Sequence, residues 1–99
     1  MSKELTPEQI ETALTDLKGW QFEENALRKD YRFGNFTQAL AFLVQVGFLA
    51  EKHNHHPQIS NVYSSVSLGL QTHDSGDKVT EKDIELAKAI DGLTPDVQA

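Results

Sequence analysis

The feature that most constrains the fold is a nearly uninterrupted apolar run from Ala39 to Ala50, in which Gln45 is the one polar residue. The run is well short of the ~20 residues that a helix needs to span a bilayer, so we expect a core helix. Its apolar residues go around most of the helix, whereas a helix on a single sheet buries one side. We therefore expect the outer side of this helix to pack against another subunit.

Capping and turn signals divide the rest of the 99-residue chain into helices and strands. Each expected helix follows a Thr or Asn cap, and Gln or Asp stands three residues after that cap. The expected helices cover residues 6–17, 35–53 and 80–91. The expected strands cover residues 20–23, 26–33, 59–63 and 66–72, with turns at Glu24-Asn25 and Ser64-Ser65.

This order, α-β-β-α-β-β-α, indicates an α+β fold with a four-stranded antiparallel sheet and three helices on one face. In the last strand Val66, Leu68 and Leu70 alternate with polar or small residues, so one face of the sheet is expected to be buried. The chain length suits one compact domain, which we expect to cover residues 1–99.

Charge and cysteine content exclude several classes of function. The chain has 9 basic and 15 acidic residues, a net charge of −6, which opposes phosphate contacts and predicts no direct nucleic-acid binding. It has no cysteine, which excludes disulfides, thiolate nucleophiles and cysteine-ligated zinc. Because no secretory hydrophobic region follows Met1, we expect a cytoplasmic protein without a membrane segment.

All four histidines lie between Glu51 and His73, and the pair His55-His56 directly precedes Pro57. Imidazole can donate and accept a proton near neutral pH, so this clustering indicates a site. A residue before proline avoids the helical conformation, and side chains of an extended segment alternate in direction. We therefore expect His55 and His56 to have different roles, one facing a pocket and the other bordering it.

A helix end, a strand end and a helix start at one rim would bring the histidine pair to His73 and Asp83. Structural interpretations remain open: His53 can be a solvated surface residue, and Asp83 can simply complete a Thr80 capping box. A metal site is a third interpretation, but the spacing lacks the H-E-x-x-H pattern and a proline follows at once. We expect neither a metal nor another cofactor.

Glu51, His55-His56-Pro57, Tyr63, His73 and Asp83 form a spaced set of functional residue types. Four further segments belong to the same sequence pattern: Gly19-Trp20, Tyr31-Arg32-Phe33, Asn61-Val62-Tyr63 and Asp83-x-x-Leu86-Ala87. Together they resemble the pterin-4a-carbinolamine dehydratase family over nearly the whole chain.

The resemblance implies dehydration of 4a-hydroxytetrahydropterin to quinonoid dihydropterin and water, the recycling step after aromatic amino acid hydroxylation. It implies that His55 and His73 transfer protons and that His56 positions the pterin. It also implies that six further residues belong to the substrate site: Asn54, Pro57, Gln71, Thr72, Asp74 and Asp83. For Asp83 the implied role includes orienting an active-site histidine. A homodimer or homotetramer is implied through the Asn35–His53 helix and a sheet edge.

The chain departs from animal relatives at Asn54, where they have aspartate, and in a loop around Gly76-Asp77 that is one residue longer. Animal relatives also act as dimerisation cofactors of a homeodomain transcription factor, so a non-catalytic binding module is the main alternative. An assembly factor or pterin-binding partner in another pathway is a third. The complete histidine set favours the enzyme.

Overall fold

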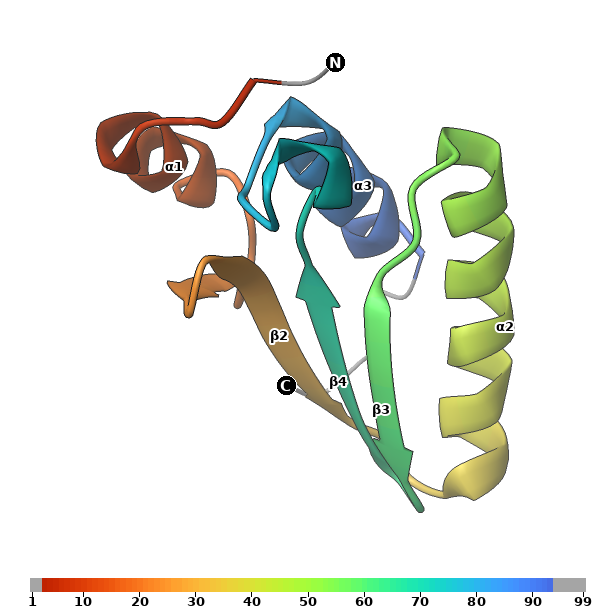
Figure 1. The fold of residues 1–99 in the computed structure, drawn as a ribbon. Helices are drawn as coiled ribbons and strands as arrows, with labels where there is room; N and C mark the ends of the chain where they lie inside the picture. Colours follow the sequence, from red (N-terminus) through yellow and green to blue (C-terminus); the bar gives the residue numbers. More distant parts are fainter. Residues whose placement is uncertain (1–2, 94–99) are drawn as a thin grey trace.

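The computed structural model describes residues 3–93 and confirms the expected α+β fold and element order (Figure 1). Its helices are α1 (Pro7–Leu14), α2 (Phe36–His53) and α3 (Glu81–Asp91), with a short 3-10 helix η1 (His73–Ser75). Its strands are β1 (Gln21–Glu23), β2 (Ala26–Arg32), β3 (Gln58–Val62) and β4 (Ser65–Leu70). The ends of the expected domain, residues 1–2 and 94–99, lie outside the described residues.

The four strands form one antiparallel sheet in the order β1-β2-β4-β3, so β1 and β3 are its edges. Leu27 of β2 pairs with Leu70 of β4, and both side chains are buried. Arg28 and Asp30, which alternate with the buried positions, lie on the opposite, more open face. The sheet therefore buries one face, as the alternation in β4 predicts.

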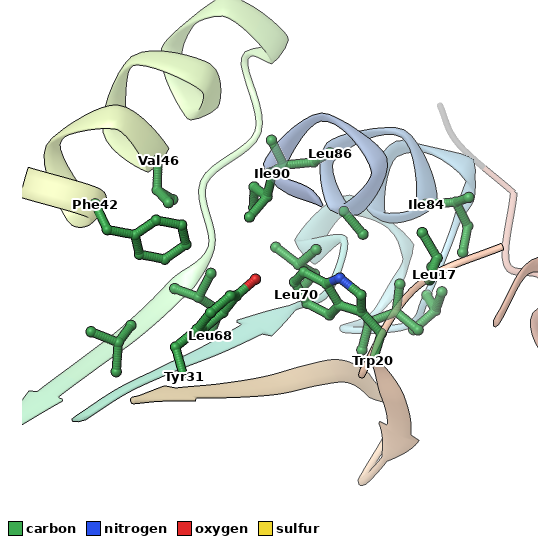
Figure 2. Packing of buried hydrophobic residues seen from close by; sticks show 14 of the residues in the cluster. Leu17, Trp20, Tyr31, Phe42, Val46, Leu68, Leu70, Ile84, Leu86 and Ile90 are labelled. Carbon is green, nitrogen blue, oxygen red and sulfur yellow. The ribbon is translucent and has the colours of Figure 1, made fainter. Parts of the chain in front are cut away.

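The core lies between this face and the helices (Figure 2). In α2 the buried residues recur every three or four positions, which is the period of a helix that packs on one side. Those residues are Ala39, Phe42, Val46 and Ala50. Ile10 of α1 and Ile84 of α3 join the same cluster, so all three helices share one core.

The other side of α2 carries four exposed apolar residues at a spacing of four, which we call the α2 stripe: Phe36, Leu40, Val44 and Phe48. Phe48 is the most exposed, at 73%. Among residues 3–93, therefore, no segment covers this side of α2. Within residues 3–93, no helix is both long and apolar enough to cross a membrane.

A partly buried ion pair fixes the C-terminal end of α3 to the sheet. Lys29 Nζ lies 3.1 Å from Asp91 Oδ1, and the Trp20 indole N–H donates to the same oxygen at 2.8 Å. The Lys18 backbone N–H donates to the second oxygen of Asp91 at 3.3 Å. Asp91 thus joins the end of α3 to both β2 and the segment before β1.

Tyr31 lies next to this pair, and its ring packs on Phe42 with centroids 4.7 Å apart. Figure 2 shows its hydroxyl oxygen among buried side chains on the α3 side of the core. Among residues 3–93 no side chain or backbone group forms a hydrogen bond with this hydroxyl. Burial and, to a lesser extent, the Asp91 carboxylate raise the pKa of Tyr31 above its ordinary value.

Most strand boundaries differ from the prediction by one residue, and two element ends differ by more. Helix α1 ends at Leu14 rather than at Leu17, because the N–H groups of residues 15–17 bond to carbonyls three residues before them instead of four, which leaves Leu17 buried but outside the helix. Strand β4 ends at Leu70, two residues before the predicted end at Thr72.

The β3–β4 turn lies at Tyr63-Ser64, one residue before the predicted Ser64-Ser65. Ser65 instead pairs with Val62, and Tyr63 takes the left-handed conformation with φ 51°. The Asn61 side-chain amide donates to the carbonyls of Tyr63 and Ser65, which stabilises this turn.

Candidate active site

The end of α2, the end of β4 and the start of α3 meet at one end of the molecule, with η1 between them (Figure 1). A cavity of about 160 Å³ lies there. Its lining residues are Asn54, His55, His56, Gln71, Thr72, His73, Asp74 and Lys82. The structure therefore brings the three candidate catalytic histidines to one shared cavity.

The end of α2 sets the direction of the histidine pair. Asn54 adopts the left-handed conformation with φ 50°, and its N–H bonds to the carbonyls of Ala50 and Glu51. The chain then turns into β3, and the two rings separate: His55 is 8% exposed, whereas His56 lies at the surface. This confirms that the two adjacent histidines differ in environment, as expected from the proline that follows them.

His55 is held by Asp83, whose side chain is fully buried. Asp83 Oδ1 lies 2.5 Å from His55 Nε2, while Oδ2 accepts from the Thr72 hydroxyl and the Thr80 backbone N–H, both at 2.9 Å. Because the Asp83 carboxylate can only accept hydrogen bonds, His55 must donate to it from Nε2–H. In a neutral His55 the other ring nitrogen, Nδ1, is then an acceptor.

The other two rings also have carboxylate partners. His56 Nε2 lies 2.6 Å from Glu51 Oε2, and His73 Nδ1 lies 2.6 Å from Asp77 Oδ1. Both pairs are largely exposed, in contrast to the buried pair of His55. Each imidazole at the cavity is therefore bonded to a separate carboxylate.

Gln71 connects the cavity to the turn that precedes β2. Its side-chain nitrogen donates to the carbonyls of Glu24 and Asn25 at 3.4 and 3.2 Å. These two residues form the β1–β2 turn, and both have positive φ. With its N–H groups bound to this turn, the Gln71 amide keeps its carbonyl oxygen as its acceptor group.

Most residues expected at the site line the cavity, and two do not. Asp83 lies behind His55, and Pro57 follows the histidine pair without joining the lining residues. Sequence reasoning did not identify Lys82 and Asp77 as site residues. For Lys82, its position between the Thr80 cap and Asp83 was a usable signal, because those two residues place it on the first turn of α3.

No three His, Cys, Asp or Glu side chains within residues 3–93 are arranged to hold a metal ion. The polar groups at the cavity instead form pairs, which suits proton transfer between side chains and a bound molecule.

Comparison with known proteins gives this arrangement a family. The model of the family described as "Pterin 4 alpha carbinolamine dehydratase" matches residues 3–93. A protein of Opitutus terrae named "Putative pterin-4-alpha-carbinolamine dehydratase" is 49% identical over 91% of this chain and 93% of its own length. A protein of Prochlorococcus marinus strain MIT 9303 with the same name is 43% identical over 92% of this chain and 94% of its own.

Two solved structures are similar. A transcriptional coactivator/pterin dehydratase from Brucella melitensis has a TM-score of 0.86 and 35% identity, covering 91% of this chain and 97% of that one. A pterin dehydratase-like protein identified as a RuBisCO assembly factor in the alpha-carboxysome has a TM-score of 0.62 and 27% identity, over 77% and 87% of the two chains. The chain belongs to the pterin-4-alpha-carbinolamine dehydratase family.

Proposed function

We propose that this chain is a dehydratase that converts 4a-hydroxytetrahydropterin to quinonoid dihydropterin and water, in the cytoplasm, as part of tetrahydrobiopterin recycling. The observation that carries this proposal is the arrangement of His55, His56 and His73 at one cavity, each with its own carboxylate. Family membership supports the same reaction.

The reaction needs two proton transfers and no redox change. The C4a hydroxyl gains a proton and leaves as water, taking the electron pair of the C4a–O bond. The N5 lone pair then forms the C4a=N5 bond, and N5 gives its proton to a base. Histidines that titrate near neutral pH suit both transfers, each contributing ~10²–10⁴-fold. In this proposal His55 and His73 carry the transfers: one ring, in its protonated form, gives its proton to the departing hydroxyl, and the other, neutral, takes the proton from N5. His56 positions the pterin.

The cavity is suited to one edge of a flat, polar ring. Its volume of about 160 Å³ is below the ~300 Å³ at which ligand pockets usually begin, so part of the pterin would lie on the open surface. Asn54, Gln71, Thr72 and Asp74 supply hydrogen-bonding groups to the ring. Asp83 has no exposed surface, so in this proposal it positions His55 and does not contact substrate.

The test is a stopped-flow assay of 4a-hydroxytetrahydropterin loss. We expect His55→Ala and His73→Ala to lower turnover at least about tenfold, because each removes a proton-transfer group. His53→Ala is the matched control, since this histidine lies on α2 outside the cavity lining. Near-normal turnover in both cavity variants would refute the assignment.

We also propose a homodimer or homotetramer that forms through α2 and the sheet edge at β3. The α2 stripe is exposed and apolar, and β3 has a strand partner on one side only. Sedimentation that shows a stable monomer at micromolar concentration would contradict this assembly.

A second candidate function is a non-catalytic binding module. The exposed stripe favours it, and the two similar solved structures are described as a transcriptional coactivator/pterin dehydratase and as a RuBisCO assembly factor. Failure to accelerate substrate loss over the spontaneous reaction, at micromolar protein, would favour this candidate over the enzyme.

A further inference from the structure

We propose that Asp77 is a positioning residue for His73, holding the ring so that Nε2 is presented to substrate as a proton acceptor. This inference rests on the proposed function, in which His73 transfers a proton. Asp77 Oδ1 lies 2.6 Å from His73 Nδ1. An ionised carboxylate can only accept, so the proton of the neutral ring lies on Nδ1 and the lone pair on Nε2.

The loop between β4 and α3 is built to bring Asp77 back to His73. The Thr72 N–H donates to the Lys78 carbonyl at 2.8 Å, and the Asp77 N–H donates to the Thr72 carbonyl at 3.1 Å. These two bonds close the loop around η1, which begins at His73. The Asp77 carboxylate is thereby held four residues after the ring that it contacts.

The backbone conformation of Asp77 is strained, and its ion pair with His73 stabilises the fold too little to offset that strain. Its φ of 61° lies in the left-handed region, which costs residues other than glycine some backbone strain, aspartate and asparagine less than most. The side chains of His73 and Asp77 are 91% and 57% exposed, and ion pairs this exposed add little to stability. Backbone strain that persists at the border of a cavity points to a role in the site.

The loop between β4 and α3 is also anchored to Asp83, the carboxylate that holds His55. The Thr72 hydroxyl donates to Asp83 Oδ2, and the other oxygen of this carboxylate holds His55. One carboxylate thus fixes His55 and the start of the loop. Asp77 supplies the remaining constraint, the orientation of the exposed His73 ring.

The test compares Asp77→Gly and Asp77→Asn with the wild-type chain. Glycine removes the carboxylate and relieves the left-handed strain. Asparagine tolerates the same backbone conformation and keeps the side-chain shape but removes the charge. Glu85→Gln, at an exposed position on α3, is the charge-matched control.

The first readout is the tautomer of neutral His73 in the free protein, measured from imidazole ¹⁵N chemical shifts. We expect the Nδ1–H form in the wild type and in Glu85→Gln, and a shift toward Nε2–H in both Asp77 variants. An unchanged tautomer in the Asp77 variants would overturn the inference. This readout does not depend on activity, so an inactive wild type would count against the proposed function alone.

The second readout separates positioning from structure. We expect kcat to fall about tenfold in both Asp77 variants, less than the ~10²–10⁴-fold of a whole acid–base group. KM should stay within about twofold, because the proton transfer that a correctly oriented His73 makes with substrate occurs only in the transition state. The melting temperature of Asp77→Gly should be unchanged or higher. An unchanged kcat, or a fall in kcat that matches a fall in melting temperature, would overturn the inference.

Discussion

The substitution Asp83→Asn separates the two roles of the Asp83 carboxylate, which caps α3 and holds His55. Asparagine has the same shape, and its amide oxygen can accept from the Thr72 hydroxyl and the Thr80 N–H, which both bond to Oδ2 in the wild type. The amide NH₂ then replaces Oδ1 and faces His55 Nε2. The capping bonds are kept, while the bond to the ring reverses its direction.

The expected loss of stability is moderate. Hydrogen bonds to charged groups contribute ~1.5–3 kcal/mol and neutral ones ~0.5–1.5 kcal/mol, so replacing the charge should lower the free energy of unfolding by about 1–3 kcal/mol. Each kcal/mol corresponds to ~4–8 °C in a domain of this size, which gives a fall in melting temperature of roughly 5–20 °C. The fold should therefore persist at 25 °C.

The expected loss of turnover is much larger. With His73 as the proton acceptor, His55 is the ring that gives its proton to the hydroxyl, from Nδ1, while Asp83 accepts from Nε2–H. An amide donor facing Nε2 prevents the ring from carrying both protons, so the donating form of His55 is lost. An Asp→Asn change that reverses a histidine tautomer lowers kcat by ~10⁴ in the Ser-His-Asp triad of proteases, so we expect at least ~10²-fold here.

Thermal unfolding and the stopped-flow assay measure the two effects on the same preparations. Gln9→Ala is the control, because it removes the corresponding capping bond to the Thr6 N–H in α1, away from the cavity. It should cost up to about 1 kcal/mol and leave turnover unchanged. Turnover within about twofold of wild type in Asp83→Asn would show that Asp83 is a cap only, and would refute its role at His55.

Three further substitutions test the core and the surface. Tyr31→Phe removes a buried hydroxyl without a partner among residues 3–93, so stability at pH 7 should be unchanged or up to ~2 kcal/mol higher by urea unfolding. Because the pKa of Tyr31 is raised in the folded chain, this tyrosine ionises in the unfolded chain first. Wild-type stability should fall above about pH 10 by up to ~1.4 kcal/mol per pH unit more than that of Tyr31→Phe, and parallel profiles would contradict this. Lys29→Met leaves the Asp91 charge in place without its partner and should cost about 3 kcal/mol in urea unfolding; a loss under about 0.5 kcal/mol would show that the pair is solvated. Phe48→Glu places a charge in the α2 stripe, and sedimentation should then show smaller, folded species, whereas an unchanged assembly would exclude Phe48 from the interface.

Helix ends were predictable where a neighbouring side chain satisfies the backbone. Asn35 and Thr80 cap α2 and α3 at the predicted positions, because their bonds involve residues two or three positions away. The β3–β4 turn was predicted one residue late, since two serines resemble a turn more than Tyr63 does. The Asn61 side chain and the pairing with β4 decide its position, and neither is visible in the local composition.

The site was predictable only in part for the same reason. Pro57 is adjacent to the histidine pair, so the separation of the two rings followed from local rules. The bond between His55 and Asp83 joins residues 28 positions apart and depends on the packing of α2 near α3. The contact of His73 with Asp77 depends on the loop closing between Thr72 and Lys78, which the sequence pattern does not reveal.

Helix α3 is attached at both ends through acidic side chains, Asp83 beneath His55 and Asp91 beneath Lys29. Eight residues separate them, about 12 Å along the axis at 1.5 Å per residue. The helix therefore cannot slide along its axis without breaking one attachment or the other. The orientation of an imidazole at one end of α3 is thus set partly by a lysine and a tryptophan at the other end of that helix, and the residues that determine the geometry of the candidate site extend well beyond the histidines.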